Sequence, residues 1–280
     1  MRRFEDKWED QEGTSFFLQG WEPEDGNPKA LVALVHGLGE HTERYIHVGS
    51  ALTNAGYAMV GFDLRGHGKS GGARGHSTSL DAYMQDIRQF LQLMEKRYSD
   101  LPRFLYGHSL GGLLVLAYAI QYGAGLQGVL ATGPALRSSL QEQKAKVAMV
   151  RVLGSLLPTM TVQSGLDATT ISRDPIVVDA YRNDPLVHYN TSLGFGKAAL
   201  SAIDLCFARA KEFPVPLLII HGKEDKITYP SGSEDFAGLV RAAGRDVTLK
   251  LWNDLYHEVH NEPEKGDVFR FMIEWLDAHV

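Results

Sequence analysis

Short apolar runs recur along this chain and are separated by longer stretches with a different pattern. The runs are Leu31–Val35, Tyr57–Phe62, Phe104–Tyr106, Leu126–Ala131, Leu217–Ile220 and Val247–Trp252. Side chains of a strand alternate between two faces, so a run that is apolar at nearly every position is typical of a strand buried on both faces. The runs therefore predict the strands of a central, mostly parallel sheet.

Stretches with helical character fill most of the intervals between these runs. They are Glu43–Ala55, Leu80–Tyr98, Gly112–Tyr122, Ser231–Ala243 and Lys265–Ala278. A further strand is expected over Thr14–Trp21, where it could pair with a strand before it. Strand and helix in alternation predict the α/β class, with helices on both faces of the sheet and functional sites at the carboxyl ends of the strands.

The alternation is interrupted once, between residues 133 and 192, where no buried-strand run occurs. A span of this length is too long for a structureless loop, so we expect helices packed over the strand ends as a cap. The predicted organisation is a core made of residues 1–132 and 193–280, with the cap inserted between its two parts.

One helix candidate in the expected cap, Val147–Leu157, has an apolar side. Val150, Leu153 and Leu157 lie on that side and are candidate substrate-binding residues, because they could line a tunnel for an apolar substrate. The alternative is that these side chains pack the cap onto the core, which is the ordinary role of an apolar stripe on a helix.

Composition narrows the range of partners and locations. The chain has 280 residues and a net charge of −6, so it offers no basic field to nucleic acid, and we expect no nucleic-acid partner. The single cysteine, Cys206, rules out an internal disulfide and is compatible with a reducing compartment. No stretch approaches the ~18 apolar residues of a membrane span, and the charged first ten residues lack the apolar region of a signal peptide. We expect a cytoplasmic protein.

The segment Gly107–Gly111 fits the nucleophile-elbow pattern Gly-x-Ser-x-Gly, with Ser109 at its centre. A predicted strand precedes it and a predicted helix follows it, which is the context that this motif requires. A strand that turns at once into a helix forces its central residue into strained geometry, so the neighbouring positions must be small. Ser109 is therefore the candidate nucleophile.

A serine nucleophile needs a base, and in hydrolases with this elbow the base is a histidine in the loop after the last strand. His257 lies in the loop that follows Val247–Trp252 and is the candidate. His260 is the alternative, because a residue three positions on faces a similar direction if the loop turns helical.

The acid that orients the histidine should lie between Ser109 and His257 in the chain. The strand Leu217–Ile220 ends in a turn-rich loop that carries two carboxylates, Glu224 and Asp225. We favour Asp225, because its shorter side chain suits a tight turn, whereas Glu224 is expected to be solvated.

Two backbone N–H groups are candidates for the oxyanion hole. One belongs to Leu110, directly after the nucleophile, and the other to Leu38, in the loop after the strand Leu31–Val35. His36 and Gly37 would let that loop turn so that the Leu38 N–H points to the same place.

A metal centre is not expected. The segment His257–His260 resembles the zinc-binding pattern His-Glu-x-x-His but is one residue short of it and lacks a third ligand downstream. The segment Asp63–Ser70 ends like a phosphate-binding loop but lacks its first glycine.

Five segments together resemble the monoacylglycerol lipase and lysophospholipase branch of the α/β-hydrolases, which is also grouped with the serine aminopeptidases. They are His36–His41, Phe62–Ser70, Gly107–Gly112, Gly222–Asp225 and Tyr256–His260. The likeness spans nearly the whole chain. Its most specific parts are the early His-Gly-x-Gly-Glu-His loop and the Gly-His-Gly-x-Ser segment.

The resemblance implies the α/β-hydrolase fold with a helical cap that forms the acyl site. It also implies a serine hydrolase that needs no metal or cofactor and cleaves esters of medium or long acyl chains, such as monoacylglycerol. By this likeness Ser109, Asp225 and His257 match the catalytic triad, and Leu38 and Leu110 match the oxyanion donors.

Several functions share these residues. Within enzymes, the alternatives are an acyl-thioesterase and a peptidase of the S33 type. A different class is a protein that keeps the fold, binds a ligand and turns over little. The expected partner is a small acyl ester, and an apolar cap could make transient contact with a membrane surface. The sequence carries no signal for an oligomeric state.

Overall fold

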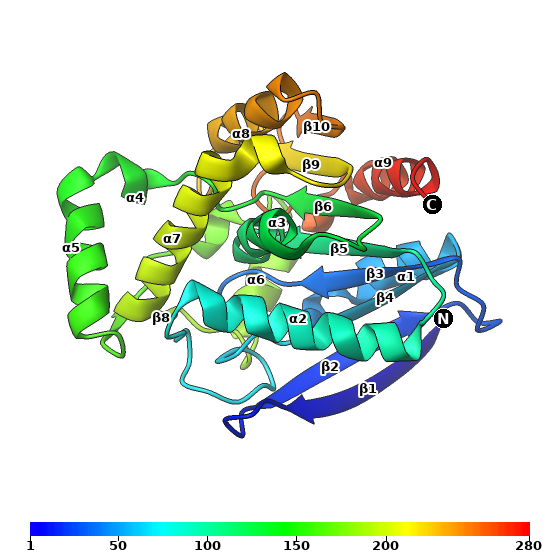
Figure 1. Cartoon of the computed structure of the whole chain (residues 1–280), viewed down its shortest axis with the longest axis horizontal. Helices are drawn as coiled ribbons and strands as arrows, with labels where there is room; N and C mark the ends of the chain where they lie inside the picture. The colour runs from blue at the N-terminus through cyan, green and yellow to red at the C-terminus, as the bar shows by residue number, and fades with distance from the viewer.

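The computed structural model describes all 280 residues and contains an eight-stranded sheet in the order β1-β2-β4-β3-β5-β6-β9-β10 (Figure 1). The strands are β1 (Arg2–Glu9), β2 (Ser15–Glu22), β3 (Ala30–Val35), β4 (Tyr57–Phe62), β5 (Arg103–His108), β6 (Gly128–Thr132), β9 (Leu217–Gly222) and β10 (Val247–Trp252). From β4 to β10 the neighbouring strands pair in parallel, which confirms the mostly parallel sheet predicted from the apolar runs.

The helices of the core lie on both faces of this sheet (Figure 1). They are α1 (Ile46–Asn54), α2 (Leu80–Arg97), α3 (Leu110–Tyr122), α7 (Leu193–Arg209), α8 (Pro230–Ala242) and α9 (Lys265–Asp277). The expected helix over Glu43–Ala55 starts as a 3-10 turn, η1 (Thr42–Tyr45), and becomes α-helical only from Ile46 onward. No helix combines the length and the apolar character needed to cross a membrane.

Strand β3 illustrates why the runs are apolar at every position. Leu31 and Val35 point into a cluster shared with α2, α3, α7 and α8. Val32 and Leu34 point into a second cluster, which α1 and α9 cover on the opposite face. All six residues of β3 are buried, so neither face tolerates a polar side chain.

The first two strands extend the sheet in the antiparallel direction. β1 pairs with β2 and β2 with β4, which agrees with the expected N-terminal strand and its partner. Trp8 of β1 stacks on Phe16 of β2 with ring centroids 4.8 Å apart. The rest of β1 is mostly charged and exposed, a composition that discourages pairing of the edge strand with other chains.

The segment 133–192 lies between β6 and α7, and we call it the cap. It contains α4 (Ser139–Glu142), α5 (Lys144–Leu156), β7 (Thr161–Gln163), η2 (Ala168–Thr170), α6 (Pro175–Asn183) and β8 (Asn190–Ser192). β7 and β8 form a small antiparallel ladder that the sequence did not predict, because strands of three residues carry no apolar run. The division of the chain into a core and a separate cap domain stays a prediction.

Helix α7 was also not predicted. Its first turn contains Gly194 and Gly196, which weaken the helical signal. The Ser192 side chain accepts a hydrogen bond from the Phe195 N–H at 3.0 Å and caps the helix. α7 contacts α3 on one side and α5 on the other, so it joins the cap to the core (Figure 1).

The parallel strands all end at the same edge of the sheet. β5 lies between β3 and β6 near the middle, and β9 and β10 follow beyond β6. The loops after β3, β5, β9 and β10 carry the candidate catalytic and oxyanion residues, and this arrangement brings them to one place.

Replacing Leu113 by alanine tests how much the packing around α3 contributes to the free energy of unfolding. Leu113 is fully buried, so we expect the free energy of unfolding to fall by about 3 kcal/mol. Leu156→Ala is the matched control, because Leu156 is 69% exposed and its loss should change the free energy by less than about 0.5 kcal/mol. Urea unfolding of both variants measures the free energy of unfolding. An equal decrease in the two variants would contradict the burial of Leu113 in the core.

Candidate active site

Ser109 occupies the sharp turn between β5 and α3. Its backbone has φ 54° and ψ −116°, a strained conformation for a residue with a side chain. A Cβ on Gly107 would lie 2.3 Å from the Gly111 carbonyl oxygen, and one on Gly111 would lie 2.0 Å from the Val35 carbonyl oxygen. Both flanking positions therefore require glycine, as the elbow pattern predicts.

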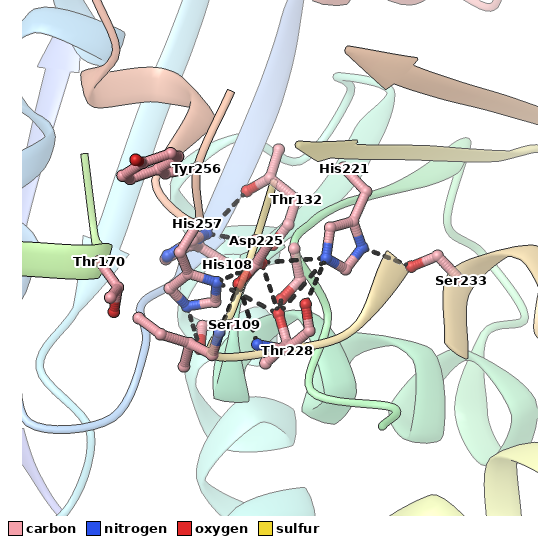
Figure 2. Close-up of polar contacts among 12 residues, drawn as sticks. His108, Ser109, Thr132, Thr170, His221, Asp225, Thr228, Ser233, Tyr256 and His257 are labelled. Atoms are coloured by element: carbon pink, nitrogen blue, oxygen red, sulfur yellow. Dashed lines mark hydrogen bonds and ion pairs between the residues drawn. The ribbon is translucent and has the colours of Figure 1, made fainter. Parts of the chain in front are cut away.

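The side chains of Ser109, His257 and Asp225 form one hydrogen-bonded relay (Figure 2). His257 Nε2 lies 2.9 Å from Ser109 Oγ, and His257 Nδ1 lies 2.7 Å from Asp225 Oδ2. Since a carboxylate only accepts, Nδ1 carries the proton and Nε2 is free to accept the serine proton. The structure thus brings together three residues that are 148 and 32 positions apart in the sequence.

Asp225 is held ionised by its neighbours. Its Oδ1 accepts the N–H groups of Ile227 and Thr228, at 2.8 and 3.0 Å, and its Oδ2 accepts the Thr228 hydroxyl at 2.8 Å. Burial alone would raise the pKa of this carboxyl group. The attraction of His257 and the hydrogen bonds from His221 and His257 outweigh burial and hold the pKa well below its ordinary value.

Burial by itself would lower the pKa of His257. The Asp225 charge and its hydrogen bond reverse that effect and raise the pKa above its ordinary value, with Glu258 and Glu40 adding to the attraction. The ring of His108 lies 4.7 Å from that of His257, but burial lowers the pKa of His108 to about 3. His108 therefore stays neutral and does not oppose a positive charge on His257.

The two alternative residues occupy other positions. His260 stacks on Tyr45 with ring centroids 4.8 Å apart, and neither of its nitrogens has a hydrogen-bond partner. Glu224 is exposed to solvent. The geometry therefore joins His257 and Asp225, and not these two residues, to Ser109.

The loop after β3 lies directly against the nucleophile. A Cβ on Gly37 would be 3.2 Å from the Ser109 Cβ. The N–H groups of Leu38 and Leu110 make no hydrogen bond within the protein. Leu110 also begins α3, where the N-terminal end of the helix favours negative charge. These two N–H groups are thus available to an oxygen at Ser109.

A buried charge cluster, which the sequence did not predict, fixes this loop. Glu40 accepts the Gly37 N–H at 2.6 Å and pairs with Arg44 at 2.7 Å. Arg44 also makes two hydrogen bonds of 2.7 Å to Glu258, the residue after His257. Burial would raise the pKa of Glu258, but Arg44 lowers it to about 2. Arg44 thereby joins the loop after β3 to the loop that carries His257.

Glu40 lies in the His36–His41 segment that carries the family resemblance, so its type was visible in the sequence. Its partner Arg44 is close in the chain, at i+4. Glu258 is 214 residues from Arg44, and no local pattern reveals that pairing.

The cap is attached to the same loop. His41 Nε2 lies 2.9 Å from Asp184 Oδ2, just after α6, and the His188 N–H donates to the Gly39 carbonyl oxygen at 2.9 Å. The position of the cap is therefore linked to the loop that carries Leu38.

The three candidate substrate-binding residues, Val150 and Leu153 of α5 and Leu157 directly after it, differ in exposure. Val150 is buried, and its Cγ1 would lie 3.0 Å from a Cβ on Gly196 of α7, so it packs helix on helix. Leu153 is half-buried, whereas Leu157 is 51% exposed. Val150 thus matches the packing alternative, and contact of these residues with substrate stays a prediction.

Replacing Arg44 by methionine tests the charge cluster. The variant leaves Glu40 and Glu258 buried without their cation, so we expect a loss of about 3–5 kcal/mol in the free energy of unfolding. Arg270→Met is the control, because Arg270 is 68% exposed and pairs with Asp267 on the surface, where loss of the pair should cost under about 1 kcal/mol. Chemical unfolding measures the free energy of unfolding of both variants. Similar values would refute a structural role for Arg44.

The serine aminopeptidase, S33 family matches residues 26–264 of this chain. A monoacylglycerol lipase from Mycolicibacterium smegmatis is 36% identical over 269 residues, which cover 96% of this chain and 95% of that protein. An abhydrolase domain-containing protein from Dictyostelium discoideum is 39% identical over 264 residues, but these are 94% of this chain and 28% of that protein. The crystal structure of a monoacylglycerol lipase from Paleococcus ferrophilus superimposes with a TM-score of 0.84 at 34% identity and covers 100% of both chains. This chain therefore belongs to the serine aminopeptidase, S33 family and has the α/β-hydrolase fold.

Proposed function

We propose that this chain is a serine ester hydrolase whose substrates are monoacylglycerols or related esters of medium or long acyl chains. The observation that carries the proposal is the relay from Ser109 through His257 to Asp225, at 2.9 and 2.7 Å, on a strained strand-to-helix turn. The choice of acyl ester is supported by the similarity to monoacylglycerol lipases over nearly the whole chain.

The first half of the reaction forms an acyl-enzyme. Ser109 Oγ attacks the ester carbonyl carbon while its proton passes to His257 Nε2. The Asp225 carboxylate stabilises the imidazolium that results. The N–H groups of Leu38 and Leu110 donate to the carbonyl oxygen as it becomes negative, and the loss of one such donor typically costs ~3 kcal/mol of transition-state stabilisation. His257 then returns its proton to the alcohol oxygen, so that the bond from that oxygen to the carbonyl carbon breaks, the alcohol leaves and the acyl-enzyme is complete.

The second half releases the acyl group as a fatty acid. A water molecule attacks the acyl carbon as His257 takes its proton, and the bond from the acyl carbon to Ser109 Oγ breaks as that proton passes to Ser109 Oγ. The cycle uses no metal and no cofactor.

We also propose that the cap meets a lipid surface, from which the substrate is collected. Large apolar side chains of α5 and the loop after it are 49–69% exposed: Met149, Val152, Leu156, Leu157 and Met160. Burial of such side chains among acyl chains is favourable. The net charge of −6 adds no attraction to anionic lipid.

We further propose that the protein is located in the cytoplasm.

Acyl-thioesters and aminoacyl amides could react by the same route, because they also pass through a tetrahedral oxyanion. Rates on a monoacylglycerol, on p-nitrophenyl esters of graded length, on an acyl-thioester and on an aminoacyl amide rank these classes. A single burst without turnover on a chromogenic ester would instead indicate a ligand-binding protein.

Ser109→Ala tests the nucleophile. We expect ester turnover to fall by at least about 10³-fold and labelling by a fluorophosphonate probe to disappear, because no other group can form the acyl-enzyme. Ser201→Ala is the control, since Ser201 lies on α7 and bonds only to the Lys197 carbonyl oxygen there. Labelling that persists in Ser109→Ala would refute the mechanism.

A double variant, Leu156→Asp with Leu157→Asp, tests the lipid contact. Two exposed leucines contribute a few kcal/mol when buried, so we expect partitioning onto neutral phosphatidylcholine vesicles to fall at least about tenfold. Turnover of a short soluble ester should stay within about twofold of the unmodified enzyme. Tyr122→Asp, at the end of α3 outside the cap, is the control. Unchanged sedimentation with vesicles would exclude this surface.

A further inference from the structure

Asp225 contacts a second histidine in addition to His257. His221 lies near the end of β9 and is completely buried. Its Nε2 is 3.0 Å from Asp225 Oδ2, the same oxygen that lies 2.7 Å from His257 Nδ1 (Figure 2). One carboxylate oxygen is therefore shared between two imidazoles.

The neighbours of His221 determine which of its nitrogens carries a proton. Nε2 lies 2.9 Å from the Thr228 carbonyl oxygen as well as beside Asp225. Both of these oxygens only accept, so Nε2 carries a hydrogen. On the other side Nδ1 lies 2.8 Å from the hydroxyl of Ser233, a buried residue of α8 that can donate to it. The ring is thus oriented with its N–H toward the carboxylate.

We propose that His221 is a positioning residue, whose N–H fixes the Asp225 carboxylate toward His257 and limits how strongly Asp225 attracts the proton of His257. This inference rests on the proposed roles of Ser109, His257 and Asp225. A hydrogen bond to a carboxylate oxygen withdraws part of its negative charge. Less charge then remains to stabilise a positive His257, so more of His257 is in the neutral form that accepts the serine proton.

The backbone explains how the two histidines reach one carboxylate. A Cβ on Gly222 would lie 2.2 Å from the Tyr256 carbonyl oxygen, so the end of β9 and the loop of His257 touch at this glycine. His221 and Asp225 flank that contact at i and i+4. His257 approaches Asp225 from one side of the carboxylate and His221 from the other (Figure 2).

The simpler explanation is that His221 only fills space between β9 and α8. Such a role affects folding, but it does not affect the pH at which His257 gains its proton. The pH dependence of the rate therefore separates the two explanations. Other ionisable groups that face His257 must stay unchanged in the comparison, and they are Glu40, Glu258, His108 and His260.

Two substitutions of His221 separate its contact with Ser233 from its N–H donation to Asp225. The Asn side chain of His221→Asn ends near the position of Nδ1, so it can still bond Ser233 but provides no N–H to Asp225. The Gln side chain of His221→Gln reaches the position of Nε2 and keeps that N–H. Comparison of kcat/KM across pH on a soluble p-nitrophenyl ester gives the readout.

The charge on Asp225 sets the direction in which the pKa of His257 should move. Without the N–H from position 221, Asp225 attracts the proton of His257 more strongly, and the pKa of His257 rises. As the pH falls, the active neutral form of His257 is then lost at a higher pH. The acid limb of the curve of kcat/KM against pH should therefore shift to higher pH by about half a unit or more in His221→Asn. We also expect kcat near neutral pH to fall about tenfold with KM within about twofold, because substrate binding is not touched. His221→Gln should restore both.

Three results would overturn the inference: an unshifted acid limb in a folded His221→Asn, a shift in the opposite direction, or a His221→Gln variant as impaired as His221→Asn. If His221→Asn does not fold, Ser233→Ala provides the test, because the His221 ring then loses the hydroxyl group that orients it. A smaller upward shift of the acid limb supports the inference and an unchanged limb refutes it. Failure of the proposed function itself is recognised separately, by fluorophosphonate labelling that persists in Ser109→Ala.

Discussion

The sharp turn at Ser109 fixes the geometry of the site, because every other site residue is arranged around this side chain. A positive φ at a serine costs free energy, and the turn persists only because both elements that it joins are immobilised. β5 lies between two parallel neighbours, and α3 is buried along nearly all of its length. The core thus holds a side chain at the edge of the sheet in a position that a free loop could not maintain. The glycines at 107 and 111 allow the close backbone approach.

Electrostatics in the buried site follow from this packing. Ionised groups are costly to bury, so each one here is paired. Asp225 receives donors at both oxygens, and Arg44 lies between Glu40 and Glu258. The result is a negative environment around His257, which favours a positive charge on this histidine. The pairs Arg44–Glu258 and Asp225–His257 join the loops after β3, β9 and β10 into one unit.

The parts of the fold that the sequence predicted share a local signal. Buried strands appear as apolar runs, and the elbow appears as glycines around a serine. Helix α7 gave no clear signal because of its early glycines, and the ladder of β7 and β8 gave none because each of its strands has only three residues. In both cases contacts with the rest of the chain stabilise an element whose own residues favour it weakly.

The candidate nucleophile, base and acid could be identified from the sequence, because the order of the loops in this fold restricts which residues can meet. The sequence could not choose between His257 and His260 by spacing alone, since residues three apart face similar directions in a turn. In the folded chain His257, and not His260, lies beside Ser109, and only the fold brings His221 to Asp225 and Arg44 to Glu258. The physical reason is that these contacts join side chains of different loops, and only the packing of the sheet and its helices sets the distances between loops.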